Sequence, residues 1–365
     1  MRKRIVRRAG IVSIGKYMPA RVVTNAEMER IVDTSDEWIV ERTGIRERHF
    51  IQDGEKQSDL AYYACREALA RVGVSPHDVD QIIVGTVTPD HIFPSSANTL
   101  AGKLGVIGPP SFDVLAACSG FIYALYQAVC SIESGRADRV LVVGSEVMSS
   151  IFDWEDRATC VLFGDGAGAV LLEPVREPLG IVDMILGSDG RHYDILNMPA
   201  GGSALPASHE TIDKHQHYLK MNGAEVFKLA VRQMGDVSTT LLGRNRLRPQ
   251  DISCFIAHQA NARIIEATAK RLGLRPNQVY NNIDKYANTT SATIPTCLYE
   301  AEAEGRIRKG DWVLLVTFGA GLTWGGILMR WAARRLPKGE LPKTPDTASD
   351  FLPDRLRPGR EWEQE

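Results

Sequence analysis

Short apolar segments alternate along this chain with longer segments whose apolar residues recur at helical spacing. This alternation favours strands and helices stacked in layers, an α/β fold, over a helix bundle or a β-sandwich. Strands are predicted at 81–85, 139–144, 169–173, 254–257 and 312–317. Helices are predicted at 58–71, 119–134, 223–242, 261–272 and 291–304.

Two pairs of segments suggest an internal repeat. Residues 74–86 are similar to 247–258, and residues 134–144 are similar to 305–316. Echoes this short also arise by chance between ordinary α/β loops. A true repeat predicts two similar halves, 1–175 and 176–335. The composition of the sequence changes after the second half, at 336–365.

The last segment, 336–365, is rich in proline and charge and has no apolar periodicity. We expect a flexible or surface-draped tail. The alternative is a docking role for its apolar side chains, Phe351, Leu352 and Trp362.

Composition narrows the class of protein. The chain has 365 residues, is 44% hydrophobic and has a formal net charge of −2, so it can bury a large core and has no global attraction to nucleic acid or membrane. Neither a signal peptide nor a membrane-spanning helix is expected. Six cysteines without a C-x-x-C pair predict reduced thiols, mostly in the core, and hence a cytoplasmic protein.

Cys118 is the candidate nucleophile. It lies where an apolar run gives way to small residues just before a long helical pattern. At the N-terminus of a helix, free backbone N–H groups and the positive end of the dipole favour a thiolate, so we expect the pKa of this thiol to be lowered.

His258 and Asn288 are candidate partners of this cysteine. His258 ends a predicted strand, and Asn288 lies in a polar loop before a predicted helix. Cysteine, histidine and asparagine form a recurrent acyl-transfer set, in which the nitrogen groups direct N–H donors at oxygen that gains charge. Spacing alone does not bring the three together, so a core cysteine and a core histidine remain an alternative.

The chain resembles the β-ketoacyl-acyl carrier protein synthase III family over about residues 9–331. The matching motifs stand in family order at 34–46, 117–121, 153–157, 163–168, 221–227, 258–261, 288–291 and 318–325. The resemblance implies the duplicated thiolase-like fold, an α/β fold layered αβαβα. Cys118 would come from the first half, and His258 and Asn288 from the second.

The resemblance also implies a reaction, a decarboxylating Claisen condensation. An acyl-coenzyme A (acyl-CoA) would acylate Cys118, and malonyl-acyl carrier protein would then lose CO2 and attack the acyl group. The products would be 3-ketoacyl-acyl carrier protein, CoA and CO2, with no cofactor. Backbone N–H groups of Cys118 and Ala320 would form one oxyanion hole, and the side chains of His258 and Asn288 the other.

Two further functions stay open beside initiation of fatty acid synthesis. The first is an acyl-CoA-dependent acyltransferase or hydrolase, or a condensing enzyme of a specialised pathway. The second is an idle acyl-binding scaffold. Ala320 stands where the family pattern has glycine, which leaves a backbone donor in place unless φ is strongly positive.

Substrate contacts are carried over from the same resemblance. Trp38 and Arg157 would flank the adenine of CoA, and Arg42 would lie near its phosphate. The tunnel for the pantetheine arm would be lined by Gly223, Phe227 and Asn261. Phe93 would reach across an interface to close the partner's acyl pocket, which predicts a homodimer.

Charged clusters complete the candidate sites. Basic residues on two predicted helices would dock the acidic carrier protein, namely Lys228, Arg263, Lys270 and Arg271. The alternative is a solvated helix face. A histidine-rich stretch with acidic neighbours, 209–217, is better explained by an exposed loop than by a metal site, and no metal is expected.

Overall fold

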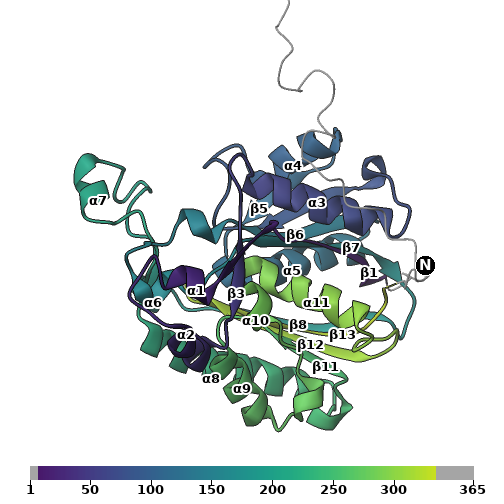
Figure 1. Ribbon diagram of the computed structural model, residues 1–365. Helices are drawn as coiled ribbons and strands as arrows, with labels where there is room; N and C mark the ends of the chain where they lie inside the picture. The colour runs from purple at the N-terminus through teal and green to yellow at the C-terminus, as the bar shows by residue number, and fades with distance from the viewer. Residues whose placement is uncertain (1–6, 334–365) are drawn as a thin grey trace, which may run out of the picture.

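Two β-sheets form the frame of the molecule in the computed structural model, which describes residues 7–333 (Figure 1). The first sheet has the strand order β1 (Arg8–Tyr17), β7 (Gly166–Val175), β6 (Val140–Glu146), β4 (Gln81–Gly85) and β5 (Ser111–Val114). The second has the order β11 (Cys254–Ala257), β12 (Trp312–Gly319), β13 (Thr323–Arg330) and β8 (Gly180–Ser188). The predicted tail at 336–365 lies outside the described residues.

Helices cover both sheets and fill the space between them (Figure 1). The outer layers are α3 (Gln57–Ala70) with α4 (Ser96–Leu104) on the first sheet, and α8 (Gly223–Arg244) with α9 (Ala262–Leu272) on the second. The middle layer holds α5 (Gly120–Glu133) and α11 (Thr293–Ala303). The predicted αβαβα layering is therefore confirmed.

The two sheets repeat one arrangement. In the first, β4 and β6 are parallel neighbours, and β7 and β1 follow antiparallel; in the second, β11 and β12 are parallel neighbours, and β13 and β8 follow antiparallel. The similar segments of the sequence lie at equivalent places, because a 3-10 turn precedes both β4 and β11: η1 (Pro76–Asp78) and η5 (Pro249–Asp251).

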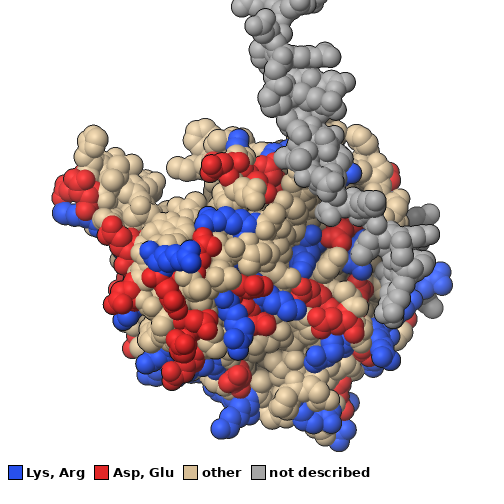
Figure 2. Space-filling view, viewed as in Figure 1, with Lys and Arg blue, Asp and Glu red and all other residues tan. Residues whose placement is uncertain are grey.

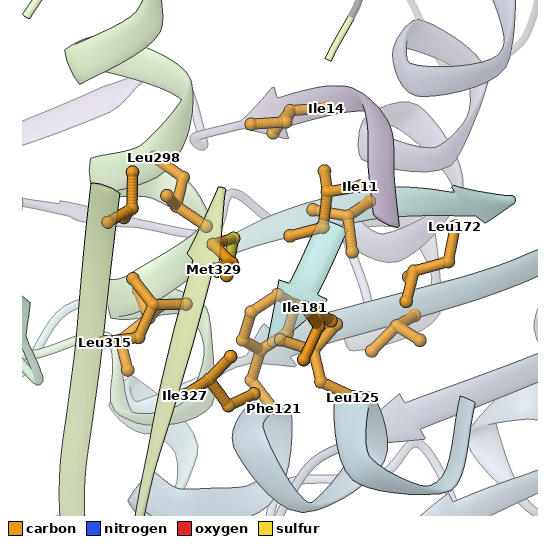
Figure 3. Packing of buried hydrophobic residues seen from close by; sticks show 14 of the residues in the cluster. Ile11, Ile14, Phe121, Leu125, Leu172, Ile181, Leu298, Leu315, Ile327 and Met329 are labelled. Carbon is orange, nitrogen blue, oxygen red and sulfur yellow. The ribbon is translucent and has the colours of Figure 1, made fainter. Parts of the chain in front are cut away.

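The largest hydrophobic cluster lies between the sheets (Figure 3). Phe121 and Leu125 from α5 and Leu298 from α11 meet strand residues of both halves there, and all three are fully buried. The first sheet and α5 approach each other closely at two glycines: a Cβ on Gly85 would lie 2.6 Å from the carbonyl carbon of Gly120. This contact fixes the start of α5 against the end of β4.

Smaller elements surround this frame. The N-terminal ones are β2 (Arg21–Thr24), α1 (Asn25–Met28), α2 (Asp36–Thr43), β3 (Glu47–Phe50) and α6 (Arg157–Cys160). Those of the second half are β9 (Leu196–Asn197), α7 (His209–Asp213), β10 (Lys220–Met221) and α10 (Ile283–Tyr286). The segment that carries α7 projects from the body of the molecule (Figure 1).

The described surface carries both signs of charge. Lys and Arg side chains are interspersed with Asp and Glu over the face shown in Figure 2, in keeping with a net charge of −2. Among the helices of residues 7–333, none combines the length and the apolar character that crossing a membrane requires.

Candidate active site

The chain turns sharply at Cys118. This residue lies in the 3-10 turn η2 (Ala117–Ser119), and α5 starts directly after it at Gly120. Ala117 has a φ of 47°, a left-handed conformation that costs a residue with a Cβ about 1–3 kcal/mol. The hydroxyl of Thr317 on β12 donates to the Cys118 carbonyl at 2.9 Å, so the second half of the chain holds this turn.

The end of β12 packs closely against the backbone of this turn. A Cβ on Gly319 would lie 2.9 Å from the backbone N of Cys118 and 3.0 Å from that of Ser119. The next residue is Ala320, whose carbonyl accepts from the Thr323 hydroxyl at 3.1 Å. The two backbone N–H groups predicted for the first oxyanion hole thus belong to segments in direct contact.

The predicted lowering of the Cys118 pKa is wrong. Burial, with a smaller effect of the Glu146 carboxyl, raises the pKa of this thiol to about 12, although the residue keeps some exposure. The backbone N–H of Cys118 lowers this pKa too little to compensate, since the charge would form in a nearly closed site. Four other cysteines are buried, Cys130 is exposed, and all six are free.

His258 follows β11 and is buried, with 2% of its surface exposed. Its backbone N–H donates to Val316 at 2.8 Å, which ties it to β12, and its Nδ1 lies 2.7 Å from the Thr293 hydroxyl at the start of α11. Burial lowers the pKa of His258 to about 3. The imidazole is therefore neutral at physiological pH.

Asn288 lies between α10 and the 3-10 turn η7 (Thr290–Ala292). Its side-chain Oδ1 accepts from the Thr290 backbone N–H at 2.9 Å, which leaves the amide NH2 as the free end of the side chain. Ala287 and Thr290 both have left-handed φ angles, 54° and 52°. Since η7 contacts η2, the loop of Asn288 meets the turn of Cys118, and the structure brings the predicted trio into one region.

Of the residues predicted to hold CoA, Arg157 and Arg42 lie beside Trp38 on α2. The guanidinium carbon of Arg157 lies 5.0 Å from the Trp38 ring centroid, and that of Arg42 lies 5.9 Å from it. Asn261 caps α9 and its side-chain N–H2 donates to the Arg42 carbonyl at 3.0 Å. Gly223 is the exposed first residue of α8, and Phe227 lies one turn further along that helix.

The predicted docking cations lie on two helices that pack together, Lys228 on α8 and the other three on α9. All four side chains are exposed. Arg263 lies over the Phe227 ring at 5.8 Å, and Arg271 forms an ion pair with Asp236 of α8. Arg271 is thus partly neutralised within its own helix pair.

One group of ligand-type side chains occurs in the described residues away from this trio. Asp153, Glu155 and His215 have donor atoms within 4.8 Å of one another. His215 Nδ1 already lies 2.9 Å from the Asp153 carboxylate, and Lys220 lies 3.5 Å from it. A nearby ammonium disfavours a cation, and the predicted histidine cluster is divided, because His217 contacts Thr211 at 2.8 Å instead.

Comparison with known proteins decides the family. Profiles described as 3-oxoacyl-[acyl-carrier-protein] synthase III, and its C-terminal part, match residues 112–190 and 242–331. The chain is 50% identical over 329 residues to the β-ketoacyl-[acyl-carrier-protein] synthase III of Koribacter versatilis, covering 90% of this chain and 99% of that protein. The β-ketoacyl-[acyl-carrier-protein] synthase III of Symbiobacterium thermophilum is 49% identical, over 89% of this chain and 99% of that protein. The chain belongs to the β-ketoacyl-acyl carrier protein synthase III family.

Solved structures of the family agree with the fold. The 3-oxoacyl-[acyl-carrier-protein] synthase III of Aquifex aeolicus superimposes with a TM-score of 0.82 at 43% identity, over 88% of this chain and all of that one. The priming β-ketosynthase of the R1128 polyketide pathway also superimposes with a TM-score of 0.82, at 32% identity, over 92% of this chain and 99% of that one. The predicted thiolase-like fold is confirmed.

This synthase III is therefore a condensing enzyme and an acyltransferase. It joins an acyl-CoA primer to malonyl-acyl carrier protein and so initiates fatty acid synthesis, as predicted. The alternative of a specialised pathway is not favoured, because relatives at about half identity are synthases III.

Sequence reasoning missed three polar residues of the synthase III site. Thr293 contacts His258, and Ser291 and the buried Glu146 connect η7 with the end of β6. No motif marks Glu146 or Thr293, since Glu146 only follows a predicted strand and Thr293 lies near the start of a predicted helix. Ser291 ends the motif at 288–291, but no role was predicted for it. These residues come together only where the two halves of the folded chain are in contact, and the sequence does not show that contact.

Proposed function

We propose that Cys118 is the nucleophile of this synthase III and that the site operates in two half-reactions. In the first, the Cys118 sulfur attacks the acyl-CoA carbonyl, the carbon–sulfur bond to CoA breaks, and the thiol proton leaves with the CoA sulfur. The single observation that carries the proposal is the position of Cys118, at the start of α5 and against the end of β12.

The first oxyanion hole follows from that position. Backbone N–H groups of Cys118 and Ala320 would bind the oxygen of the tetrahedral intermediates, where charge develops. The high pKa of Cys118 supports a thiol at rest that loses its proton only as the thioester is attacked. The start of α5 stabilises the charge on sulfur during that step.

In the second half-reaction, malonyl-acyl carrier protein loses CO2, and the resulting enolate carbon attacks the acyl group on Cys118. His258 and Asn288 would bind the enolate oxygen. The neutral imidazole suits this role in the tautomer with its proton on Nε2. That tautomer requires the Thr293 hydroxyl to turn from the Thr290 carbonyl, 3.0 Å away, and to donate to Nδ1, 2.7 Å away. The Asn288 amide is oriented by its Oδ1 bond, which leaves NH2 as the donor.

For the CoA primer we infer a clamp at the molecular surface. The Trp38 ring and the Arg157 guanidinium would flank adenine, and Arg42 would neutralise phosphate. Since Arg157 now lies 5.0 Å from the Trp38 ring centroid, its guanidinium would move outward to admit the base. Gly223, Phe227 and Asn261 would line the pantetheine path. The electron pair of the carbon–carbon bond that breaks on loss of CO2 forms the new carbon–carbon bond, so no cofactor enters this scheme.

We further propose that the protein is a homodimer that pairs through β5. This strand is at the open edge of the first sheet, and such an edge offers unpaired backbone groups to a second chain. Four large apolar side chains near it are at least 80% exposed: Ile92, Phe93, Ile107 and Leu115. A second copy would cover them, and Phe93 would reach the partner's acyl pocket.

The carrier protein and the compartment complete the proposal. Lys228, Arg263 and Lys270 would receive the acidic carrier protein, with Arg271 contributing less because of its pairing with Asp236. A cytoplasmic location fits six free cysteines and a carrier-dependent pathway.

Intact-protein mass after incubation with a panel of acyl-CoA thioesters, followed by malonyl-acyl carrier protein, tests the proposed function. We expect an acyl adduct on the wild type and none on Cys118→Ala, and discharge of the adduct as 3-ketoacyl product. Discharge without a carbon–carbon bond would support simple acyl transfer, and an adduct retained by Cys118→Ala would refute the assignment of the nucleophile.

A further inference from the structure

Glu146 is a buried carboxyl group that the proposed mechanism does not use. It ends β6 and is fully shielded from solvent. It takes part in no ion pair among the residues that the structure describes, although burying an unpaired carboxylate is costly. The side chain must therefore be neutral, or its charge must be balanced by hydrogen bonds alone.

The hydrogen bonds of the two carboxyl oxygens differ. Oε2 accepts from the Thr88 hydroxyl at 2.7 Å, the Val87 backbone N–H at 3.0 Å and the Thr86 hydroxyl at 3.1 Å. Oε1 has a single partner in the described structure, the Ser291 hydroxyl at 2.8 Å. The donors thus converge on Oε2, as they would on the carbonyl oxygen of a carboxylic acid.

A count of protons at Ser291 decides where the acid proton is. The Ser291 oxygen lies 2.8 Å from Glu146 Oε1 and also 2.8 Å from the Gly85 carbonyl oxygen. Both separations are typical of a full O–H···O hydrogen bond, yet a serine hydroxyl has one proton. Since a carbonyl cannot donate, the second proton belongs to Glu146, which donates from Oε1 to Ser291 while Ser291 donates to Gly85.

This chain of bonds ends on the loop of the proposed decarboxylation donors. Ser291 is the middle residue of η7, which follows Asn288 and precedes Thr293, the partner of His258. Thr290 in the same turn has a left-handed φ of 52°, so the turn must be held by its surroundings. Glu146 and Gly85 belong to the first half of the chain and hold the turn from that side.

We propose that Glu146 is an uncharged carboxylic acid and a positioning residue, which donates to Ser291 and thereby holds Asn288 and His258 in place for decarboxylation. The inference rests on the proposed function for the roles of Asn288 and His258. Burial raises the pKa of Glu146 to about 7, so the carboxyl group keeps its proton below about pH 7.

Infrared difference spectroscopy at pH 6 tests the protonation state without any substrate. The wild-type protein is expected to show the carbonyl stretch of a protonated carboxylic acid, and this band is lost in Glu146→Gln. Asp165 provides the matched control, since it is also buried and accepts from Ser149 and Ile51. Burial raises the pKa of Asp165 to about 6, so at pH 6 this group adds a band of its own, and Asp165→Asn removes only that contribution. The band assigned to Glu146 is the part that Glu146→Gln removes. Asp165→Asn should leave that part in place.

Release of CO2 from malonyl-acyl carrier protein and acylation by acyl-CoA, measured separately, test the positioning role. Glu146→Gln keeps a neutral donor facing Ser291, whereas Glu146→Asp keeps the acid but is too short to reach, and Ser291→Ala removes the acceptor. We expect CO2 release at least about tenfold faster in Glu146→Gln than in Glu146→Asp or Ser291→Ala, since a buried bond is lost in the latter two. Acylation should change less than about threefold in all three variants.

Two results would overturn the inference. A wild-type spectrum without the band assigned to Glu146 would mean an ionised Glu146 and a Ser291 proton shared between two acceptors. Equal loss of both half-reactions in Glu146→Asp and Ser291→Ala would mean general destabilisation. If the wild type neither acylates nor releases CO2, the proposed function fails instead, and the infrared band still decides the state of Glu146.

Discussion

Replacing Gly319 with alanine tests the contact on which the first oxyanion hole depends. The new Cβ would lie 2.9 Å from the Cys118 backbone N, whereas ordinary contact begins at 3.4 Å, so the two segments must separate by about 0.5 Å. Both are backbone, Gly319 in β12 and Cys118 in η2 next to α5, and cannot yield as a side chain would. Overpacking of this kind costs about 1–3 kcal/mol of stability.

The effect on the reaction is expected to be larger. An oxyanion donor acts at 2.7–3.1 Å, and about 0.5 Å of displacement takes Cys118 N–H or Ala320 N–H out of that range. We therefore expect Gly319→Ala to slow acylation by about 100-fold, the loss that accompanies removal of one donor. The assay is rapid-quench acylation by acyl-CoA, read as the intact mass of the protein.

Gly243→Ala is the matched control for this substitution. Gly243 lies in α8, and a Cβ there would meet nothing within 4 Å. Alanine in a helix stabilises relative to glycine by about 0.5–1 kcal/mol, so this variant should acylate like the wild type. Acylation by Gly319→Ala at the wild-type rate would refute the assignment of these N–H groups to the oxyanion hole.

Further predictions concern stability and each binding surface. His258, with its pKa lowered to about 3, takes up a proton on unfolding below about pH 6.5, so stability falls as pH falls; urea titrations should show a loss near 2 kcal/mol at about pH 5 that His258→Gln lacks. Trp38→Ala should raise KM for acyl-CoA by roughly tenfold and leave KM for an acyl-pantetheine, which has no adenine, unchanged; equal effects on both substrates would argue against adenine stacking. Arg263→Glu should raise KM for malonyl-acyl carrier protein without slowing acylation, and more than Arg271→Glu does, because Arg271 is already paired; a loss of both half-reactions would contradict a docking role. Leu115→Glu, at a side chain that is 80% exposed, should give a monomer by light scattering that still unfolds in one cooperative transition, at a melting temperature no longer raised by association, and a persistent dimer would exclude β5 as the interface.

Local patterns predicted most of the regular elements. The predicted helix at 119–134 is α5 (Gly120–Glu133), and the predicted strand at 254–257 is β11. Strand β13 was not predicted, because Gly325 and Gly326 interrupt its apolar pattern. Those glycines are needed at close approaches: a Cβ on Gly326 would lie 2.5 Å from Val237 of α8. A long-range contact determines the residue type there, and no local pattern carries that information.

The site was predicted unevenly for the same reason. Motifs predicted Cys118, His258 and Asn288 as site residues, and the structure brings the segments that carry them into one region, while their catalytic roles stay predictions. The direction of the Cys118 pKa was wrong, since a helix start is visible in the sequence and the burial that outweighs it is not. Glu146 and Thr293 have no local signature, because their roles come from contacts across the two halves.

The repeated arrangement of the two sheets divides the chemistry between two copies of one structural unit. Cys118 precedes α5 in the first copy, and Asn288 precedes the equivalent α11 in the second. Exchange of one copy between relatives would thus combine the proposed nucleophile of one parent with the proposed decarboxylation donors of the other. Such chimaeras must preserve the pairs that join the copies, Lys16 with Glu300 at 2.7 Å and Arg71 with Glu302 at 2.9 Å, so compatibility at this seam limits which parents can be combined.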